Sequence, residues 1–209
     1  MRILAGFYKG KAFQMPKGIR PTQDKVRKAL FDILGDLEGL TFLELFAGSG
    51  AVGLEAASRG AREVVCVEQD RLSLKAITAN IASVGARACQ ALPLAVEAAI
   101  HRLHRQGRAF DIVFLDPPYE KAPATPNPIG RVAPCLIGRQ VRHSRGGVPP
   151  SAAKKTLHTL GTYDIVAPDG FVIVQHFKKD ALPDALGVLR LLRRSRYGDT
   201  VLSFYRKGE

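Results

Sequence analysis

The chain of 209 residues contains no tryptophan and only three cysteines. Cys66, Cys89 and Cys135 are far apart and form no Cys-x-x-Cys pair, which argues against a disulfide framework and against a zinc site. We therefore expect no bound metal. The chain also lacks any apolar run close to the roughly 20 residues that a membrane span needs, and its first residues contain no signal-peptide core. These absences predict a soluble, cytoplasmic protein with no membrane partner.

Acidic residues are scarce as well. The chain has 31 Lys and Arg against 19 Asp and Glu, a net charge of +12. The segments 1–36, 121–150 and 190–207 each carry a net charge of +5, so the remainder carries −3. Separate basic segments indicate a polyanionic partner, because cations that bind phosphates release counterions. A basic surface that only keeps the protein in solution remains the alternative. The first segment supplies the candidate contacts to such a polyanion, which are Arg2, Lys9, Lys11, Lys25, Arg27 and Lys28.

The N-terminal residues combine a hairpin pattern with a helix pattern. Residues 2–14 predict a short hairpin that turns near Gly10. The apolar positions of residues 26–34 repeat with helical spacing, which predicts an amphipathic helix. Either Thr22 or Asp24 is expected to cap this helix at its N-terminus.

From residue 41 onward, apolar runs alternate with helical stretches, which predicts right-handed βαβ units on a parallel sheet. The chain then ends in an antiparallel hairpin over residues 189–206. This order predicts an α/β, Rossmann-like sheet. The expected strands are 41–46, 63–68, 86–90, 111–115 and 170–175, and the expected helices are 50–59, 71–82, 94–105 and 152–160.

We divide the chain into an N-terminal hairpin and helix extension, residues 1–39, and a main domain, residues 40–209. One segment of the main domain, 121–150, interrupts the alternation of strands and helices. Ten of its thirty residues are Pro or Gly, five are basic and none is acidic. Such a composition cannot build a core. The segment is expected to be a basic loop, either a substrate-contacting flap or an inert insertion.

Residues 44–53 read Glu-Leu-Phe-Ala-Gly-Ser-Gly-Ala-Val-Gly and lie between the first strand and the first helix of this domain. Glycines in such a turn let the backbone approach a ligand closely. The motif matches the dinucleotide fingerprint, and Glu68 ends the next strand, where it can accept from ribose hydroxyls. That pattern alone fits NAD. Two features favour S-adenosylmethionine: Glu44, which is placed to meet the methionine ammonium, and the motif at 116–119.

The motif Asp116-Pro117-Pro118-Tyr119 follows the fourth strand, at the edge where open parallel sheets bind ligands. Two consecutive prolines lack N–H donors and keep the backbone extended, so carbonyl oxygens stay available beside a carboxylate. We expect the Asp116 carboxylate and the Pro117 carbonyl to accept hydrogen bonds from the N–H groups of an amine on a base, while Tyr119 stacks on that base. An ionised carboxylate accepts only, which matches the adjacent donors of guanine better than the mixed edge of adenine.

Four motifs together carry a family resemblance: residues 20–22 (Arg-Pro-Thr) with the helix that follows, 44–50, 67–70 (Val-Glu-Gln-Asp) and 116–119. With them the chain resembles the bacterial 16S ribosomal RNA (guanine-N2)-methyltransferase family. The resemblance extends over most of the chain outside 121–150. It implies a class I S-adenosylmethionine-dependent methyltransferase sheet with a C-terminal antiparallel hairpin and a small N-terminal extension.

The resemblance also implies roles for particular residues. This chain departs from the family pattern at two places. Gln90 stands where an acid commonly meets the adenine, and after the fifth strand Gln175-His176 stands where Glu is frequent. The residues implied to hold the cofactor are Arg20, Thr22, Glu44, Phe46, Gly48, Gly50, Glu68 and Gln90.

The implied activity is methyl transfer from S-adenosylmethionine to the exocyclic N2 amine of a single guanine in 16S ribosomal RNA. The substrate is expected to be a 30S particle or an assembly intermediate, and the enzyme a monomer. Two alternatives stay open: an adenine-N6 DNA methyltransferase, and a non-catalytic basic RNA-binding factor for ribosome assembly. The presence of Glu44, Gly48, Gly50, Glu68 and Asp116 argues against the second.

Overall fold

The computed structural model of the chain describes residues 1–16, 23–118 and 151–208. Four of the expectations above concern residues outside these ranges, namely Arg20, Thr22, Tyr119 and the segment 121–150.

The described residues form an α/β structure. Its helices are α1 (Asp24–Leu34), α2 (Ala51–Ser58), α3 (Arg71–Val84), α4 (Val96–Arg105) and α5 (Ala152–Thr162). Its strands are β1 (Thr41–Leu45), β2 (Glu63–Glu68), β3 (Cys89–Pro93), β4 (Phe110–Leu115), β5 (Val166–Phe177), β6 (Ala185–Leu186), β7 (Leu189–Tyr197) and β8 (Thr200–Lys207).

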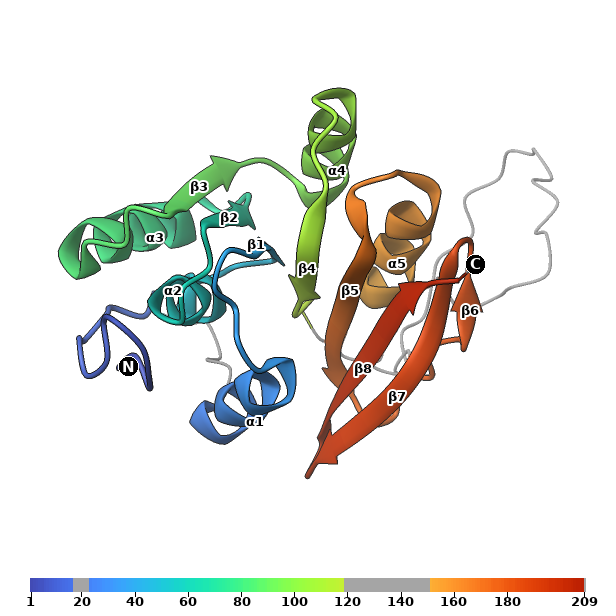
Figure 1. The fold of residues 1–209 in the computed structure, drawn as a ribbon, viewed down its shortest axis with the longest axis horizontal. Coiled ribbons are helices and arrows are strands. Elements are labelled where there is room, and N and C mark those ends of the chain that lie inside the picture. The colour runs from blue at the N-terminus through green and yellow to red at the C-terminus, as the bar shows by residue number, and fades with distance from the viewer. Residues whose placement is uncertain (17–22, 119–150, 209) are drawn as a thin grey trace, which may run out of the picture.

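All eight strands belong to one sheet, in the order β3-β2-β1-β4-β5-β8-β7-β6 (Figure 1). Strands β1 to β5 pair in parallel, and the β7–β8 hairpin adds to β5 in antiparallel fashion. The prediction of a Rossmann-like sheet with a terminal hairpin is therefore confirmed.

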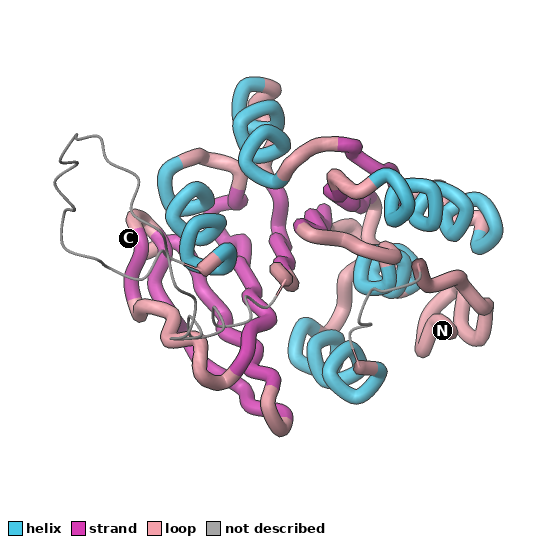
Figure 2. The backbone as a smooth tube through the Cα atoms, turned by 180° about the vertical axis from the view of Figure 1, so that it is seen from behind, coloured by secondary structure: helices cyan, strands magenta, loops and turns pink. Residues whose placement is uncertain are grey.

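Helices cover both faces of the sheet. Buried residues of α1, α2 and α3 share an apolar cluster with one face, and those of α4 and α5 share a second cluster with the other (Figures 1 and 2). Because both faces are covered, all five residues of β1 are buried. In α4, the buried residues Val96, Ala99, Ile100 and Leu103 recur with helical spacing, which is why this polar helix lies against the sheet.

Two strands differ from their expected bounds. Strand β3 begins at Cys89 because residues 86–89 form a turn, in which the N–H of Cys89 donates to the carbonyl of Ala86 at 2.9 Å. It therefore ends at Pro93 rather than at residue 90. Strand β5 is longer than expected, and its pairing with β4 shifts register between Phe110 and Ile112.

The N-terminal prediction is only partly correct. The expected hairpin reduces to one antiparallel bridge between Arg2 and Ala12, because the chain turns at both Gly6 and Gly10 with positive φ. Helix α1 begins as expected, but Asp24 is its first residue rather than its cap, and the capping position belongs to Gln23, whose side chain makes no cap bond.

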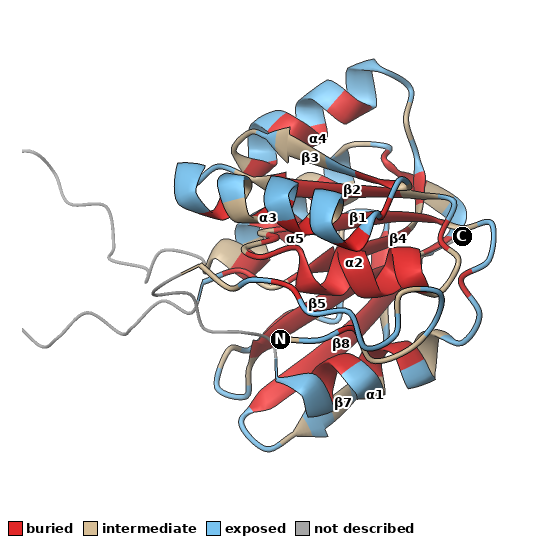
Figure 3. Ribbon diagram, turned by 90° about the vertical axis from the view of Figure 1, so that its left-hand side faces the viewer, coloured by how far each residue is buried: buried red, intermediate tan, exposed pale blue. Residues whose placement is uncertain are grey.

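Helix α2 holds the N-terminal residues in place, and all eight of its residues are buried (Figure 3). The Glu55 carboxylate accepts from the N–H groups of Leu4 and Ala5 at 2.8 and 3.0 Å, and Ser58 Oγ accepts from the N–H of Tyr8 at 2.9 Å. Ile3 belongs to the same apolar cluster as the sheet residues on this face. The boundary at residue 39 stays a prediction.

None of the described helices has the length and apolar character required to cross a bilayer.

Close contact between α2 and the sheet depends on Gly53. A Cβ atom at this position would lie 2.6 Å from Sγ of Cys66, 2.8 Å from Oε2 of Glu44 and 3.0 Å from Cγ1 of Val64. Real Cβ atoms do not approach other atoms this closely, so any side chain here would push α2 away from β1 and β2.

We therefore expect Gly53→Ala to lower the free energy of unfolding by up to about 3 kcal/mol, measured by urea denaturation. Cys66→Ala removes the nearest clashing atom, so the double variant should lose less stability than the two single variants added together. Strictly additive losses would contradict this account of the α2 contact.

Candidate functional site

The candidate site lies at the carboxyl edge of β1, β2 and β4. Strand β1 is followed by α2 toward β2 on one side, and β4 pairs with β1 on the other, so the sheet order reverses between β1 and β4. Leu45 and Leu115 are register partners, which places the next residues, Phe46 and Asp116, at the same level of neighbouring strands. Open α/β sheets bind ligands at such a switch point.

The turn after β1 has an unusual backbone. Phe46, Gly48 and Gly50 have φ values of 61°, 56° and 73°. Within the part of the chain that the structure describes, Phe46 is the one residue other than glycine whose φ is positive. Glycine adopts this conformation without steric cost, whereas for Phe46 it costs about 1 kcal/mol. Gly50 then serves as the N-cap of α2. At Gly48 and Gly50 the turn thus presents backbone atoms at the sheet edge, where a ligand can approach closely.

Glu68 fastens the turn to the end of β2. Its Oε2 accepts from the N–H of Gly48 at 2.8 Å, and its Oε1 accepts from the N–H groups of Gln69 and Asp70 at 2.8 and 2.9 Å. A carboxylate has about four acceptor positions, so one remains in this conformation. One ribose hydroxyl can donate to that free position. A second hydroxyl can donate to Glu68 only if one of the three existing hydrogen bonds breaks.

Glu44 lies beneath the same turn with its side chain buried. Its carboxylate accepts from the N–H groups of Val52 and Gly53 at 3.3 and 2.9 Å and from Sγ of Cys66 at 3.4 Å. Removal from water raises the pKa of Glu44 to about 7, and the nearby Asp116 adds to this rise, although the hydrogen bonds oppose it. The structure therefore shows Glu44 bound to the first turn of α2. Its expected contact with a methionine ammonium stays a prediction.

Asp116 is half-buried at the end of β4, followed by buried Pro117 and exposed Pro118. Its Oδ2 accepts from Nε2 of Gln175 at 2.7 Å. Gln175 lies on β5, next to β4 in the sheet. Sequence reasoning named Gln175 only as a departure from a family pattern. The register pair of Leu115 and Val174 places the next residues, Asp116 and Gln175, side by side, and this pairing between strands has no signal in the sequence.

The structure corrects the expected place of Gln90. This residue is the second of β3, is exposed, and donates from Nε2 to Oε1 of Glu63, the first residue of β2, at 3.1 Å. It therefore lies toward the amino end of the strands, away from the glycine turn. The residues that follow the carboxyl end of β3 are Leu94 and Ala95, so Gln90 is not placed to contact an adenine there.

One of the six expected RNA contacts is also corrected. Arg27 is fully buried: its Nη2 donates to the carbonyl of Arg2 at 2.6 Å and to Oδ1 of Asp24 at 3.0 Å, and its guanidinium lies over the ring of Phe13. Burial lowers the pKa of this guanidinium. Helical spacing placed Arg27 on the polar face of α1, but the first thirteen residues fold over that face, so Arg27 cannot reach a surface ligand.

The other five candidates are exposed, and three of them have intramolecular partners. Arg2 Nη1 donates to the carbonyl of Gly10 at 3.1 Å. Lys11 Nζ donates to the carbonyl of Val84 at 2.7 Å, and Lys28 forms an ion pair with Asp32. Arg2, Lys9, Lys11, Lys25 and Lys28 thus stay available for phosphate contacts.

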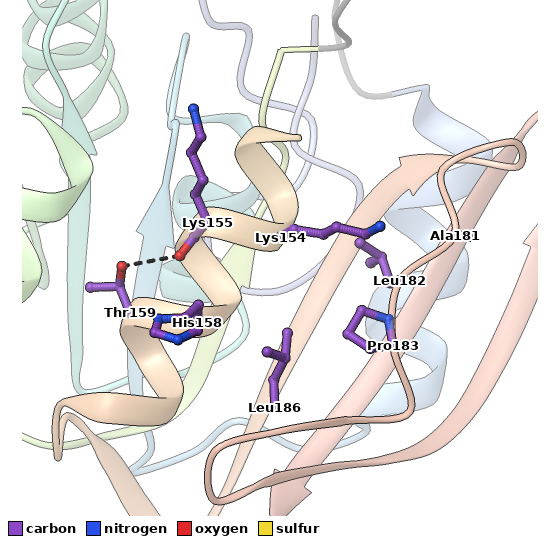
Figure 4. A pocket seen from close by; sticks show the side chains of 8 residues that line it. All are labelled: Lys154, Lys155, His158, Thr159, Ala181, Leu182, Pro183 and Leu186. Carbon is purple, nitrogen blue, oxygen red and sulfur yellow. Dashed lines mark hydrogen bonds between the residues drawn. The ribbon is translucent and has the colours of Figure 1, made fainter. Parts of the chain in front are cut away.

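A pocket of about 770 Å³ lies between α5 and residues 181–186. Figure 4 shows its floor of Leu182, Pro183 and Leu186, with Lys154 and His158 beside it. It contains none of the predicted site residues. Its lining among the described residues has three cationic or ionisable basic side chains and no acidic one, which favours an anionic ligand.

The chain is similar in sequence and in structure to several known proteins. The family model described as conserved hypothetical protein 95 matches residues 1–134. A putative rRNA methyltransferase, YlbH of Bacillus subtilis (strain 168), is 28% identical over 99% of each chain. Ribosomal RNA small subunit methyltransferase D of Escherichia coli (strain K12) is 36% identical over 58% of this chain and 61% of that protein. The structure of the putative methyltransferase yhhF from Escherichia coli superposes with a TM-score of 0.73, at 26% identity, covering 99% of this chain and 97% of that one.

The buried Glu44 predicts a pH-dependent stability. Because its pKa rises from 4.5 to about 7, its contribution is complete below pH 4.5 and is lost as the pH rises through 7. Glu44→Gln cannot ionise. Between about pH 4 and pH 8 we expect the native chain to lose about 3 kcal/mol more unfolding free energy than this variant, measured by urea denaturation. Exposed Glu97→Gln is the control, and equal pH dependence in all three proteins would contradict the assignment.

Proposed function

The chain belongs to the conserved hypothetical protein 95 family, and on that basis we propose that it transfers a methyl group from S-adenosylmethionine to the N2 amine of one guanine in 16S ribosomal RNA. Its fold is the Rossmann-like fold of class I methyltransferases, and its named relatives are ribosomal RNA methyltransferases. The observation that carries the proposal is the placement of the Asp116 carboxylate beside the glycine turn, on neighbouring strands.

The residues of the turn fit such a cofactor. Gly48 and Gly50 leave the edge of β1 without side chains, and Glu68 supplies an acceptor for a ribose hydroxyl. Phe46, half-buried at the start of the turn, offers an apolar surface to the methionine half. S-adenosylmethionine, when bound, supplies an electrophilic methyl group on a sulfonium.

Asp116 and Pro117 act on the nucleophile. The exocyclic amine of guanine is a poor nucleophile because its lone pair is delocalised into the ring. Hydrogen bonds from its protons to the Asp116 carboxylate and the Pro117 carbonyl let the nitrogen pyramidalise and direct its lone pair at the methyl carbon. As the new C–N bond forms and the C–S bond breaks, the proton that nitrogen loses leaves along the bond to Asp116. The base must be unpaired or flipped to reach these acceptors.

Basic side chains support RNA as the substrate. The exposed cations of the N-terminal segment and the pocket beside α5 offer phosphate contacts on separate parts of the described surface. We place the enzyme in the cytoplasm, as a monomer that acts on a 30S particle or an assembly intermediate.

The test combines labelled S-adenosylmethionine with naked 16S RNA, with assembled and partly assembled 30S particles, and with DNA, and then maps the modified base. Label at the N2 position of one guanine in the RNA is expected. Label in DNA alone would establish the adenine-N6 alternative, and RNA binding without label in any substrate would favour the assembly factor.

Removing the carboxylate should separate chemistry from cofactor binding. We expect Asp116→Ala to bind S-adenosylmethionine with unchanged affinity, measured by calorimetry, and to lose methyl transfer by about 100-fold or more. The control is Asp164→Ala, which removes an exposed carboxylate that pairs with Lys207. A fully active Asp116→Ala variant would exclude the mechanism.

The pocket cations should contribute to RNA affinity. If Lys154 and Lys155 each contact a phosphate, the double alanine variant should reduce the slope of log affinity against log salt by about 2, with unchanged cofactor affinity. The matched control is Arg102→Ala with Arg105→Ala, on the last turn of α4. Equal slopes for the native chain and the Lys154/Lys155 variant would remove the pocket from the RNA interface.

A further inference from the structure

Gln175 is a buried polar residue at the candidate site whose side chain is only half satisfied. It is 5% exposed, and its Nε2 donates to Oδ2 of Asp116 at 2.7 Å. Its Oε1 is buried and has no hydrogen-bond donor among the residues that the structure describes. Buried amide oxygens are nearly always paired, so this acceptor needs an explanation.

The orientation of the amide follows from Asp116. An ionised carboxylate only accepts hydrogen bonds, so the NH₂ group of Gln175 must face it and the oxygen must face away. Turning the amide over would direct Oε1 at the carboxylate and replace attraction with repulsion. The bond to Asp116 thus explains why Oε1 has no donor within the ranges 1–16, 23–118 and 151–208.

The surroundings of Gln175 favour an apolar residue. On this face of the sheet its neighbours are Ile173 on the same strand and Leu202, its register partner on β8, both in the apolar cluster. A leucine would fill similar space without leaving an unpaired buried acceptor, which destabilises a fold. The amide at position 175 is therefore unfavourable for stability, apart from what it does for Asp116.

The strand that carries Gln175 is rigidly supported. Strand β5 is hydrogen-bonded to β4 on one side and to β8 on the other over this stretch. By contrast, Asp116 lies just past the end of β4 and precedes two prolines that donate no hydrogen bonds. A donor fixed in a central strand can hold a strand-end carboxylate in one rotamer.

We propose that Gln175 is the positioning residue of Asp116: its amide N–H holds Oδ2 so that the carboxylate is oriented toward the amine that is methylated. This inference rests on the proposed methyl transfer for its catalytic consequence, while the coupling between the two side chains is a property of the protein alone. Gln175 touches neither substrate nor cofactor in this role. It acts through Asp116.

The first test replaces the amide with an apolar side chain. Gln175→Leu should lower kcat by about 10- to 100-fold on the RNA substrate that the native chain methylates, because the carboxylate loses the bond that fixes its Oδ2 and a shift of about an ångström is enough to slow the reaction. Its affinity for S-adenosylmethionine and its Tm should be equal to those of the native chain or higher. Gln106→Leu, at the exposed end of α4, is the matched control. An unchanged kcat would overturn the inference.

A conservative variant provides a second readout. Gln175→Glu can donate to Asp116 only while its own carboxyl group is protonated, and the neighbouring carboxylate favours that protonation. The ratio of its kcat to that of the native chain should therefore fall as the pH rises, which loss of packing would not cause. If Gln175→Leu does not fold, this ratio decides: a ratio that is constant with pH overturns the inference.

A third measurement requires no substrate, so it separates failure of this inference from failure of the proposed function. In the Asp116→Ala background neither polar end of Gln175 has a partner among the residues described in the structure, so adding Gln175→Leu should raise Tm more than it does in the native chain. Equal shifts in the two backgrounds would overturn the inference. Coupling between the residues without methylation of any RNA would instead refute the proposed function and retain the contact.

Discussion

The hydrogen bonds between the buried Glu44 carboxylate and the first turn of α2 hold the strand before the glycine turn against the helix after it. They join β1 to α2 across the glycine turn, and Gly53 allows the helix to come close enough to form them. A buried carboxylate is costly unless its acceptors are used, and the N-terminus of a helix is well suited to use them. The shape of the turn follows from this constraint.

Helix α2, fixed in this way against the sheet, in turn fixes the N-terminal residues. On its outer side, Glu55 and Ser58 bind the backbone of residues 4–8. The flanking residues Arg2 and Phe13 contact Arg27 of α1, which is buried. At the sheet edge, Glu68 binds the turn through Gly48. Three carboxylates that accept from backbone N–H groups thus connect the N-terminal residues, the glycine turn and the end of β2.

On the other side of the switch point, the position of the Asp116 carboxylate depends on a contact between two strands. Asp116 ends β4, and the amide of Gln175 reaches it from β5. The proposed cofactor side of the site therefore depends on backbone amides, and the proposed substrate side on a side-chain amide. This difference fits the two tasks, because a turn must follow the shape of a bound ligand while a reacting amine needs one carboxylate in one orientation.

The sequence by itself determined the fold class, the glycine turn and the place of Asp116, because each depends on local features: alternation of apolar runs, glycines at fixed spacing, and prolines after a buried strand. Those features also placed α1 and the terminal hairpin almost at their observed bounds. They failed for Arg27, whose helical position is polar by periodicity, and for Gln90, whose strand begins three residues later than its apolar run suggested. The burial of Arg27 and the pairing of Gln175 with Asp116 join residues 25 and 59 positions apart. Only the tertiary structure decided them, because such contacts depend on how separate elements pack, which no local pattern encodes.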